Sequence, residues 1–193
     1  WGAGPSGEGA TVFHYDTGEG ITVPHHSSLA VVGDLTICAW IKMPSFPYYH
    51  QIVGKGTSYP EPYGLAVGPS GDIFGISGDG SGQDYTTASS NMSTDTWYFV
   101  AAVRDGSDFT AYTNAVANGA TTIGTTPGDT GLDLALGNRT DFAVPFIGSI
   151  SHVRLWDRAL SESEIGDIYA DIRFGELISS FNPGWANGAS QIL

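Results

Sequence analysis

The chain has 193 residues, of which 20 are acidic and 7 are basic, so its formal net charge is −13 at pH 7. Binding to nucleic acid or to an anionic membrane surface depends on clustered Lys and Arg, and this composition argues against both. No apolar run approaches the roughly 18 residues of a membrane span, so we expect no membrane insertion. The 27 glycines, 10 prolines and 12% aromatic residues favour many short strands joined by tight turns over a disordered chain.

The N-terminal segment 1–10 is rich in glycine and has no hydrophobic periodicity, so we expect a flexible arm. Trp1 is a large apolar residue to leave in water, and it either packs on the domain or meets a neighbouring subunit. Residues 11–15 and 20–23 are predicted strands on either side of an acidic turn at 16–19.

Two later segments predict central strands of a sheet. In residues 35–42 both alternating sets of side chains are largely apolar, which is typical of a strand covered on both faces. Residues 97–103 form a second nearly continuous apolar strand. Cys38 is the only cysteine, and inside an apolar strand it is expected to be a small core residue.

The segment 44–62 is the most aromatic loop-like region, arranged around one short predicted strand at 51–54. Sugars present flat C–H faces that stack on aromatic rings, while their hydroxyls reach polar neighbours. The alternative is that these rings cover the rim of the fold or an oligomer contact. With polar and aromatic residues from later loops, the candidate carbohydrate-binding set is Tyr48, Tyr49, His50, Tyr59, Tyr63, Asp84, Tyr85, Arg139 and Asp141.

The segment 148–173 predicts one last strand followed by a helix. Ser161 stands three residues before Glu164, the spacing of a capping box at a helix start. The apolar residues that follow recur at i, i+3, i+4 and i+7, which is one face of a short helix; they are Ile165, Ile168, Tyr169 and Ile172.

This closing pattern, Arg-x-Trp-Asp-Arg-Ala-Leu-Ser followed by Glu-Ile and an aromatic, resembles that of the laminin G-like, concanavalin A-like jelly-roll domains. Earlier segments resemble the family in the same order: 14–23, 34–42 (DLTICAWIK), 63–67, 96–105 (TWYFVAAVRD) and 134–137. The resemblance covers residues 11–172. It implies an all-β fold, a two-sheet antiparallel β-sandwich with one short C-terminal helix, followed by a C-terminal extension at 173–193.

In the resembling families the first acidic loop commonly contributes carboxylate oxygens to a structural calcium, which would make Asp16 and Glu19 the candidate ligands. The family usually carries further acidic residues in the last strand, where this chain has Ser151 and His152. The alternative is an acidic turn that faces solvent.

Relatives with this architecture include glycoside hydrolases and polysaccharide lyases. Hydrolysis of a glycosidic bond needs two carboxyl groups about 5 to 10 Å apart across a cleft. The Glu-x-Asp-x-x-Glu strand of such hydrolases is missing, and the nearest pair, Glu162 and Glu164, begins the predicted helix. We therefore predict that the chain is not an enzyme, with a hydrolase or lyase as the least favoured alternative.

The first hypothesis for function is non-catalytic recognition of an extracellular glycan or glycoprotein through loops at the rim of the sandwich. The second is a structural protein displayed on a cell or virion surface, which would self-associate or contact neighbouring subunits through its termini. The apolar residues that would make such contacts are Trp1, Phe174, Phe181 and Trp185.

Overall fold

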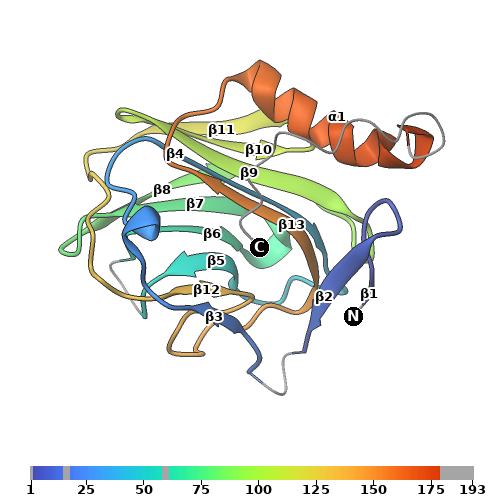
Figure 1. The fold of residues 1–193 in the computed structure, drawn as a ribbon, viewed down its shortest axis with the longest axis horizontal. Coiled ribbons are helices and arrows are strands. Elements are labelled where there is room, and N and C mark those ends of the chain that lie inside the picture. The colour runs from blue at the N-terminus through green and yellow to red at the C-terminus, as the bar shows by residue number, and fades with distance from the viewer. Residues whose placement is uncertain (1, 15–17, 58–60, 179–193) are drawn as a thin grey trace.

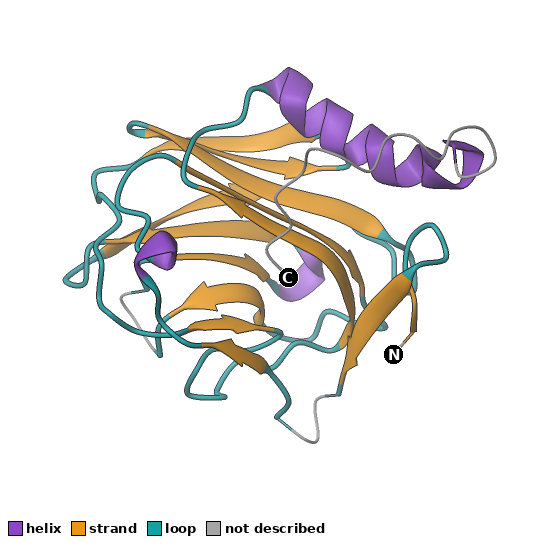
Figure 2. Cartoon of the chain, viewed as in Figure 1, coloured by secondary structure: helices purple, strands orange, loops and turns teal. Residues whose placement is uncertain are grey.

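The computed structural model describes residues 2–14, 18–57 and 61–178, with side chains up to residue 171. This part of the chain forms two stacked antiparallel sheets with a helix across the outside of one of them (Figure 1, Figure 2). The predicted fold class, a two-sheet β-sandwich with a late helix, is confirmed. No helix among the described residues is long and apolar enough to cross a membrane.

One sheet, here called the helix-side sheet, has seven strands. In spatial order they are β1 (Gly2–Ala3), β2 (Gly9–Phe13), β13 (Gly148–Trp156), β4 (Leu35–Lys42), β9 (Tyr98–Asp105), β10 (Asp108–Thr113) and β11 (Val116–Thr122). The second sheet has six: β3 (Ile21–Val23), β12 (Leu134–Leu136), β5 (His50–Lys55), β6 (Tyr63–Val67), β7 (Ile73–Gly78) and β8 (Gln83–Ala88). Helix α1 spans Glu162–Ile178, and two single turns of 3-10 helix lie at Ser27–Leu29 and Pro69–Gly71.

Strand β4 is buried on both faces, as the sequence predicts. Leu35, Ile37 and Ile41 point into the core between the two sheets. Cys38 and Trp40 point the other way, into a second cluster beneath α1. The two sets alternate along the strand because successive side chains of a β-strand point to opposite faces. Burial on both sides therefore places β4 at the centre of its sheet.

Helix α1 begins with the predicted capping box. The Ser161 backbone N–H donates to the Glu164 carboxylate over 2.8 Å, and the Glu164 N–H donates back to the Ser161 hydroxyl. Arg158 donates to both oxygens of the same carboxylate. Hydrogen bonds from Arg158 and Ser161 lower the pKa of Glu164 to about 2. The helix continues to Ile178, six residues beyond the predicted end of the domain at residue 172.

Residues 2–13 form a β-hairpin, which corrects the expectation of a flexible arm for the described part of segment 1–10. Strand β1 pairs with β2, with Gly2 opposite Ala10. The turn of this hairpin is held by Glu8, which accepts hydrogen bonds from Ser6 and lies 3.5 Å from the Nδ1 atom of His152 on β13. The hairpin therefore extends the helix-side sheet.

Candidate functional site

The outer face of the second sheet carries the residues that could meet a ligand. In β6 the side chains of Tyr63, Leu65 and Val67 lie in the core, so the alternate positions Gly64 and Ala66 face outward. The pairing of the strands continues this face sideways in two adjacent rows. One row runs Gln51, Ala66, Phe74 and Thr87, and the other runs Gly54, Gly64, Ile76 and Tyr85.

Two glycines make room for a polar side chain on this face. A Cβ atom at Gly64 would lie 2.8 Å from the Nε2 atom of Gln51, and one at Gly54 would lie 2.9 Å from it. The Gln51 amide therefore lies flat over the backbone of β5 and β6. Its Nε2 donates to the Val53 carbonyl over 2.7 Å and to the Glu61 carboxylate over 3.1 Å.

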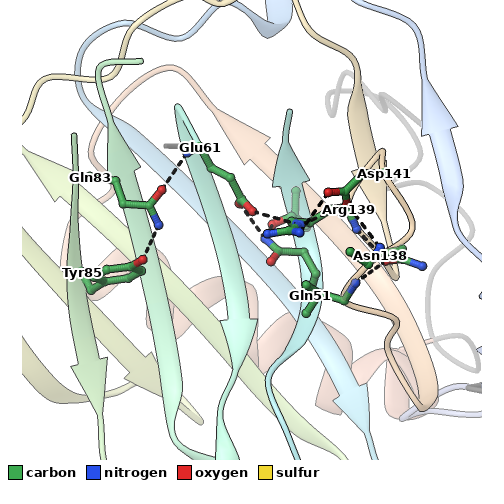
Figure 3. Close-up of polar contacts among 10 residues, drawn as sticks. Gln51, Glu61, Gln83, Tyr85, Asn138, Arg139 and Asp141 are labelled. Carbon is green, nitrogen blue, oxygen red and sulfur yellow. Dashed lines mark hydrogen bonds and ion pairs between the residues drawn. The ribbon is translucent and has the colours of Figure 1, made fainter. Parts of the chain in front are cut away.

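Glu61 lies at the middle of a hydrogen-bond network that crosses the sheet (Figure 3). Its carboxylate accepts from Gln51 and lies 3.9 Å from Nε of Arg139. Its backbone N–H donates to the Gln83 side chain over 2.7 Å, and Gln83 donates in turn to the Tyr85 hydroxyl. Residues from β5, the loop between β5 and β6, β8 and the loop after β12 are thus joined into one unit.

Burial dominates the electrostatics of this unit. The Glu61 residue is only 3% exposed. Loss of solvent raises the pKa of its carboxyl to about 7, with the positive charge of Arg139 acting against that rise. The group therefore titrates near neutral pH, where an ordinary glutamate is fully ionised.

The loop after β12 supplies a charged pair at the edge of the face. Arg139 forms a bidentate ion pair with Asp141, with N–O distances of 3.1 and 3.0 Å. The buried side chain of Asn138 fixes the loop: its Oδ1 accepts the backbone N–H groups of Arg139 and Val144. Both Arg139 and Asp141 keep part of their side chains exposed, so they can reach a ligand.

Aromatic rings complete the surface. Tyr48, Tyr49 and Tyr85 are 62%, 56% and 45% exposed. The ring of Tyr49 meets that of Phe74 edge to face, with centroids 5.2 Å apart. Phe74 and Tyr85 are members of the two outward-facing rows. Tyr85 therefore lies on this face, and Tyr49 packs against it through Phe74. We call the set Tyr49, Gln51, Glu61, Phe74, Gln83, Tyr85, Arg139 and Asp141 the outer-face site.

Several predicted residues lie elsewhere. His50 and Tyr63 are buried: His50 hydrogen-bonds through Nδ1 to the Pro145 carbonyl, and the Tyr63 hydroxyl donates to the Leu29 carbonyl. This corrects the expectation that they contact a ligand. Asp84 instead anchors a loop by accepting the backbone N–H groups of Gly124 and Thr125.

Sequence reasoning missed Gln51, Glu61, Phe74 and Gln83. One available signal was Gln51, a polar residue within an otherwise apolar short strand, and another was Glu61, an acid enclosed by two prolines. Neither signal reveals that the two side chains meet. The meeting depends on a β-bulge in β5, where the register with β6 shifts between Gln51 and Val53.

Four predicted residues, Tyr59, Trp1, Phe181 and Trp185, lie outside the described residues. Phe174 lies in α1, beyond the last described side chain. The assembly role predicted for the termini therefore stays a prediction.

The predicted calcium loop is described only in part, because Asp16 lies outside the described residues. Glu19 is exposed, and its carboxylate accepts a hydrogen bond from the His14 backbone N–H. The described residues gather no group of three or more acidic, histidine or cysteine side chains that could hold a metal. They therefore do not by themselves fit a calcium site, and calcium stays a prediction that rests on the resemblance.

Comparison with known proteins agrees with the fold. A family model described as concanavalin A-like lectin/glucanases superfamily, Laminin_G_3, matches residues 16–166. The match covers most of the chain, and the protein therefore belongs to this superfamily. A search of curated protein sequences gave no significant match.

Solved structures with the same fold include several carbohydrate-associated domains. Domain 4 of AbnA, a GH43 extracellular arabinanase from Geobacillus stearothermophilus in complex with arabinotriose, superposes with a TM-score of 0.70 at 20% identity, covering 87% of this chain and 79% of that one. The CBM40 of Ruminococcus gnavus IT-sialidase, bound to α2,3-sialyllactose, gives 0.63 at 18% identity, covering 78% and 96%. A heptameric SAP-like pentraxin from Limulus polyphemus gives 0.57 at 19% identity, covering 78% and 81%.

Proposed function

We propose that this domain is a non-catalytic, extracellular carbohydrate-binding module that binds a glycan on the outer-face site. The observation that carries the proposal is a pair of exposed tyrosine rings, Tyr49 and Tyr85, tied to one sheet face that also carries a buried polar network. Rings of this kind offer flat apolar surfaces to the C–H face of a sugar.

The polar groups of the site suit hydroxyl recognition. Arg139 donates hydrogen bonds and Asp141 accepts them, and their mutual ion pair holds both in fixed positions. Glu61 lies behind them as a positioning residue, since its carboxylate faces Arg139 and Gln51 rather than solvent. A rigid set of aromatic and polar groups loses little conformational entropy when a ligand binds.

The relatives support the same proposal. Two structural neighbours were solved with a bound sugar, arabinotriose in one and sialyllactose in the other. The first neighbour is a domain of an arabinanase, and the second is a domain of a sialidase.

The carboxylates of Glu61 and Asp141 both face Arg139. This arrangement fixes the guanidinium of the proposed binding residue.

The test is binding of glycans to the protein and to Tyr85→Ala. We screen a glycan array that includes arabinotriose and α2,3-sialyllactose, and measure Kd for each hit by calorimetry. Loss of one stacking ring removes about 1 kcal/mol, so we expect binding to weaken about fivefold. Tyr49→Ala should act in the same direction.

The matched control is Val116→Ala, which removes an exposed apolar side chain from β11 of the helix-side sheet. It should leave Kd unchanged. An array without hits, or an equal Kd for the protein and Tyr85→Ala with every hit, would contradict the proposal.

A further inference from the structure

A cavity lies over the helix-side sheet, on the opposite side of the molecule from the outer-face site. It has a volume of about 450 Å³ and is lined by Pro5, Ser6, Trp40, Thr96, Trp97, Tyr98, Asn114 and Tyr169. These residues come from the N-terminal hairpin, β4, the segment that leads into β9, the turn after β10, and α1. The volume falls in the range of about 300 to 1,000 Å³ that is usual for small-molecule sites.

The floor of this cavity is built of aromatic rings. Trp40 and Tyr169 stack face to face, with centroids 5.6 Å apart and an interplanar angle of 11°. Phe99 packs against both rings. The face of Trp97 is held by the Lys42 ammonium, 5.4 Å from its centroid. The rings are therefore fixed before any ligand enters.

Trp40 contributes a buried donor that is unpaired within the described part of the chain. Its residue is 4% exposed, and no hydrogen-bond partner meets the indole Nε1 atom among the described residues. Buried polar groups in native proteins are nearly always paired, so this donor beside the cavity is a group that a ligand oxygen or a water would satisfy.

The turn after β10 adds a second polar group. Oδ1 of Asn114 accepts the Phe99 backbone N–H over 3.1 Å, which fixes the orientation of the amide. The Nδ2 group of the same amide has no hydrogen bond to the described residues, and Asn114 is partly exposed within the lining. Its two N–H bonds can be donated to an oxygen in the cavity.

The charge of the lining selects the ligand class. The lining residues that belong to the described part of the chain are all uncharged, in a protein whose formal net charge is −13. A cationic ligand would be drawn instead to the acidic surface, and an anionic one would be repelled by the whole molecule. A neutral ring with apolar faces and hydroxyl oxygens fits both the aromatic floor and the two donors.

We infer that this cavity is a second binding site that takes one or two rings of a neutral saccharide. The site is separate from the outer-face site, because it lies on the other sheet and shares no residue with it. A domain with both sites would bind two saccharide chains, or two parts of one chain, on opposite sides.

The experiment titrates neutral arabino-, gluco-, galacto- and manno-oligosaccharides by calorimetry into the protein and into three variants. Thr96→Trp fills the cavity from its exposed rim, Asn114→Asp keeps the Oδ1 acceptor but removes the donor, and Tyr85→Ala weakens the outer-face site. Thr94→Trp, an equal change at an exposed neighbouring position outside the lining, is the control. Thermal melting checks that each variant is folded.

We expect at least one neutral oligosaccharide to bind the protein and Tyr85→Ala with equal affinity. Thr96→Trp and Asn114→Asp should weaken that binding at least tenfold, and Thr94→Trp should not. The inference is overturned if no neutral oligosaccharide binds Tyr85→Ala, or if binding survives Thr96→Trp. Failure of the proposed function gives a different result from failure of this inference. If no saccharide binds the outer-face site, Tyr85→Ala leaves all binding intact, while Thr96→Trp still reduces it.

Discussion

Glu61 shows at the scale of one residue how a site is held together at a cost in stability. Its carboxyl is buried and its pKa is raised to about 7, so at neutral pH the folded protein holds a proton that an unfolded chain would release. The folded state therefore loses stability as the pH rises from about 4.5 through 7. The same carboxyl group accepts a hydrogen bond that fixes the Gln51 amide, and it faces the guanidinium of Arg139.

Glu61→Gln should remove this cost. Because each pKa unit corresponds to 1.36 kcal/mol, the variant should be more stable than the protein by at most about 3 kcal/mol at pH 8 and by little at pH 4. Urea denaturation at both pH values measures the difference. Glu19→Gln, at an exposed carboxylate, is the control. A gain that is equal at pH 4 and pH 8 would contradict the assignment.

Residue-scale prediction from sequence was least secure in the aromatic segment. Tyr49 and His50 are neighbours in the chain, yet the ring of Tyr49 is exposed and that of His50 is buried against Phe146. Composition marks both as candidate ligands of a sugar. Which of them faces solvent depends on contacts with segments about 95 residues away, such as the Pro145 carbonyl, and no local pattern carries that information.

Helix α1 shows at the scale of an element that a local signal can be reliable when it is complete. The capping box and the apolar spacing together predicted the helix start, and both are present. The end of the helix was harder to predict, because Arg173–Ile178 carries no strong signal that stops a helix. Strands β4 and β9 were predictable for a related reason: apolar residues on both faces require a central position.

The bulges were not predictable. β13 changes register with β4 between Ser151 and Arg154, and His152 there has a φ of 50°, which is uncommon for a residue other than glycine. The family pattern gives the strand but not the extra residue, at which His152 lies 3.5 Å from Glu8 of the N-terminal hairpin.

Ile165→Ala tests how firmly α1 is attached. Ile165 is fully buried in the cluster beneath the helix, so its truncation should cost about 2 to 5 kcal/mol. Hydrogen exchange should show faster exchange in α1 than in β5–β7, since the core between the sheets is untouched. Asp167→Ala, at an exposed position of the same helix, should have little effect. Equal acceleration in α1 and β5–β7 would show that the helix and sandwich unfold together.

At the scale of the whole molecule, the two sheets close on each other where β11 passes over β8. A Cβ atom at Gly119 would lie 1.8 Å from the Thr87 carbonyl oxygen, so the two backbones are in direct contact. Thr87 lies in the same strand as Tyr85. The edge of the outer-face site therefore depends on a contact between sheets.

Gly119→Ala should separate this edge and lower the free energy of unfolding by about 2 to 4 kcal/mol, a cost typical of overpacking against backbone. Gly166→Ala is the matched control, because nothing lies within 4 Å of its Cβ position in α1. It should stabilise the protein by up to about 1 kcal/mol, through the higher helix propensity of alanine. Chemical denaturation measures both. Equal effects of the two substitutions would contradict the role of the β8–β11 contact.

The cover that α1 provides has a consequence for handling the protein. Trp40, Phe99 and Tyr112 belong to the apolar cluster beneath it, and an apolar surface of this kind exposed to water promotes aggregation. Acid strong enough to protonate Glu164 would weaken the start of the helix, because its contribution is complete above about pH 4.5 and is lost as the pH falls toward 2. In strong acid, helix α1 should thus detach from the helix-side sheet before the two sheets unfold, and precipitation should follow from this detachment.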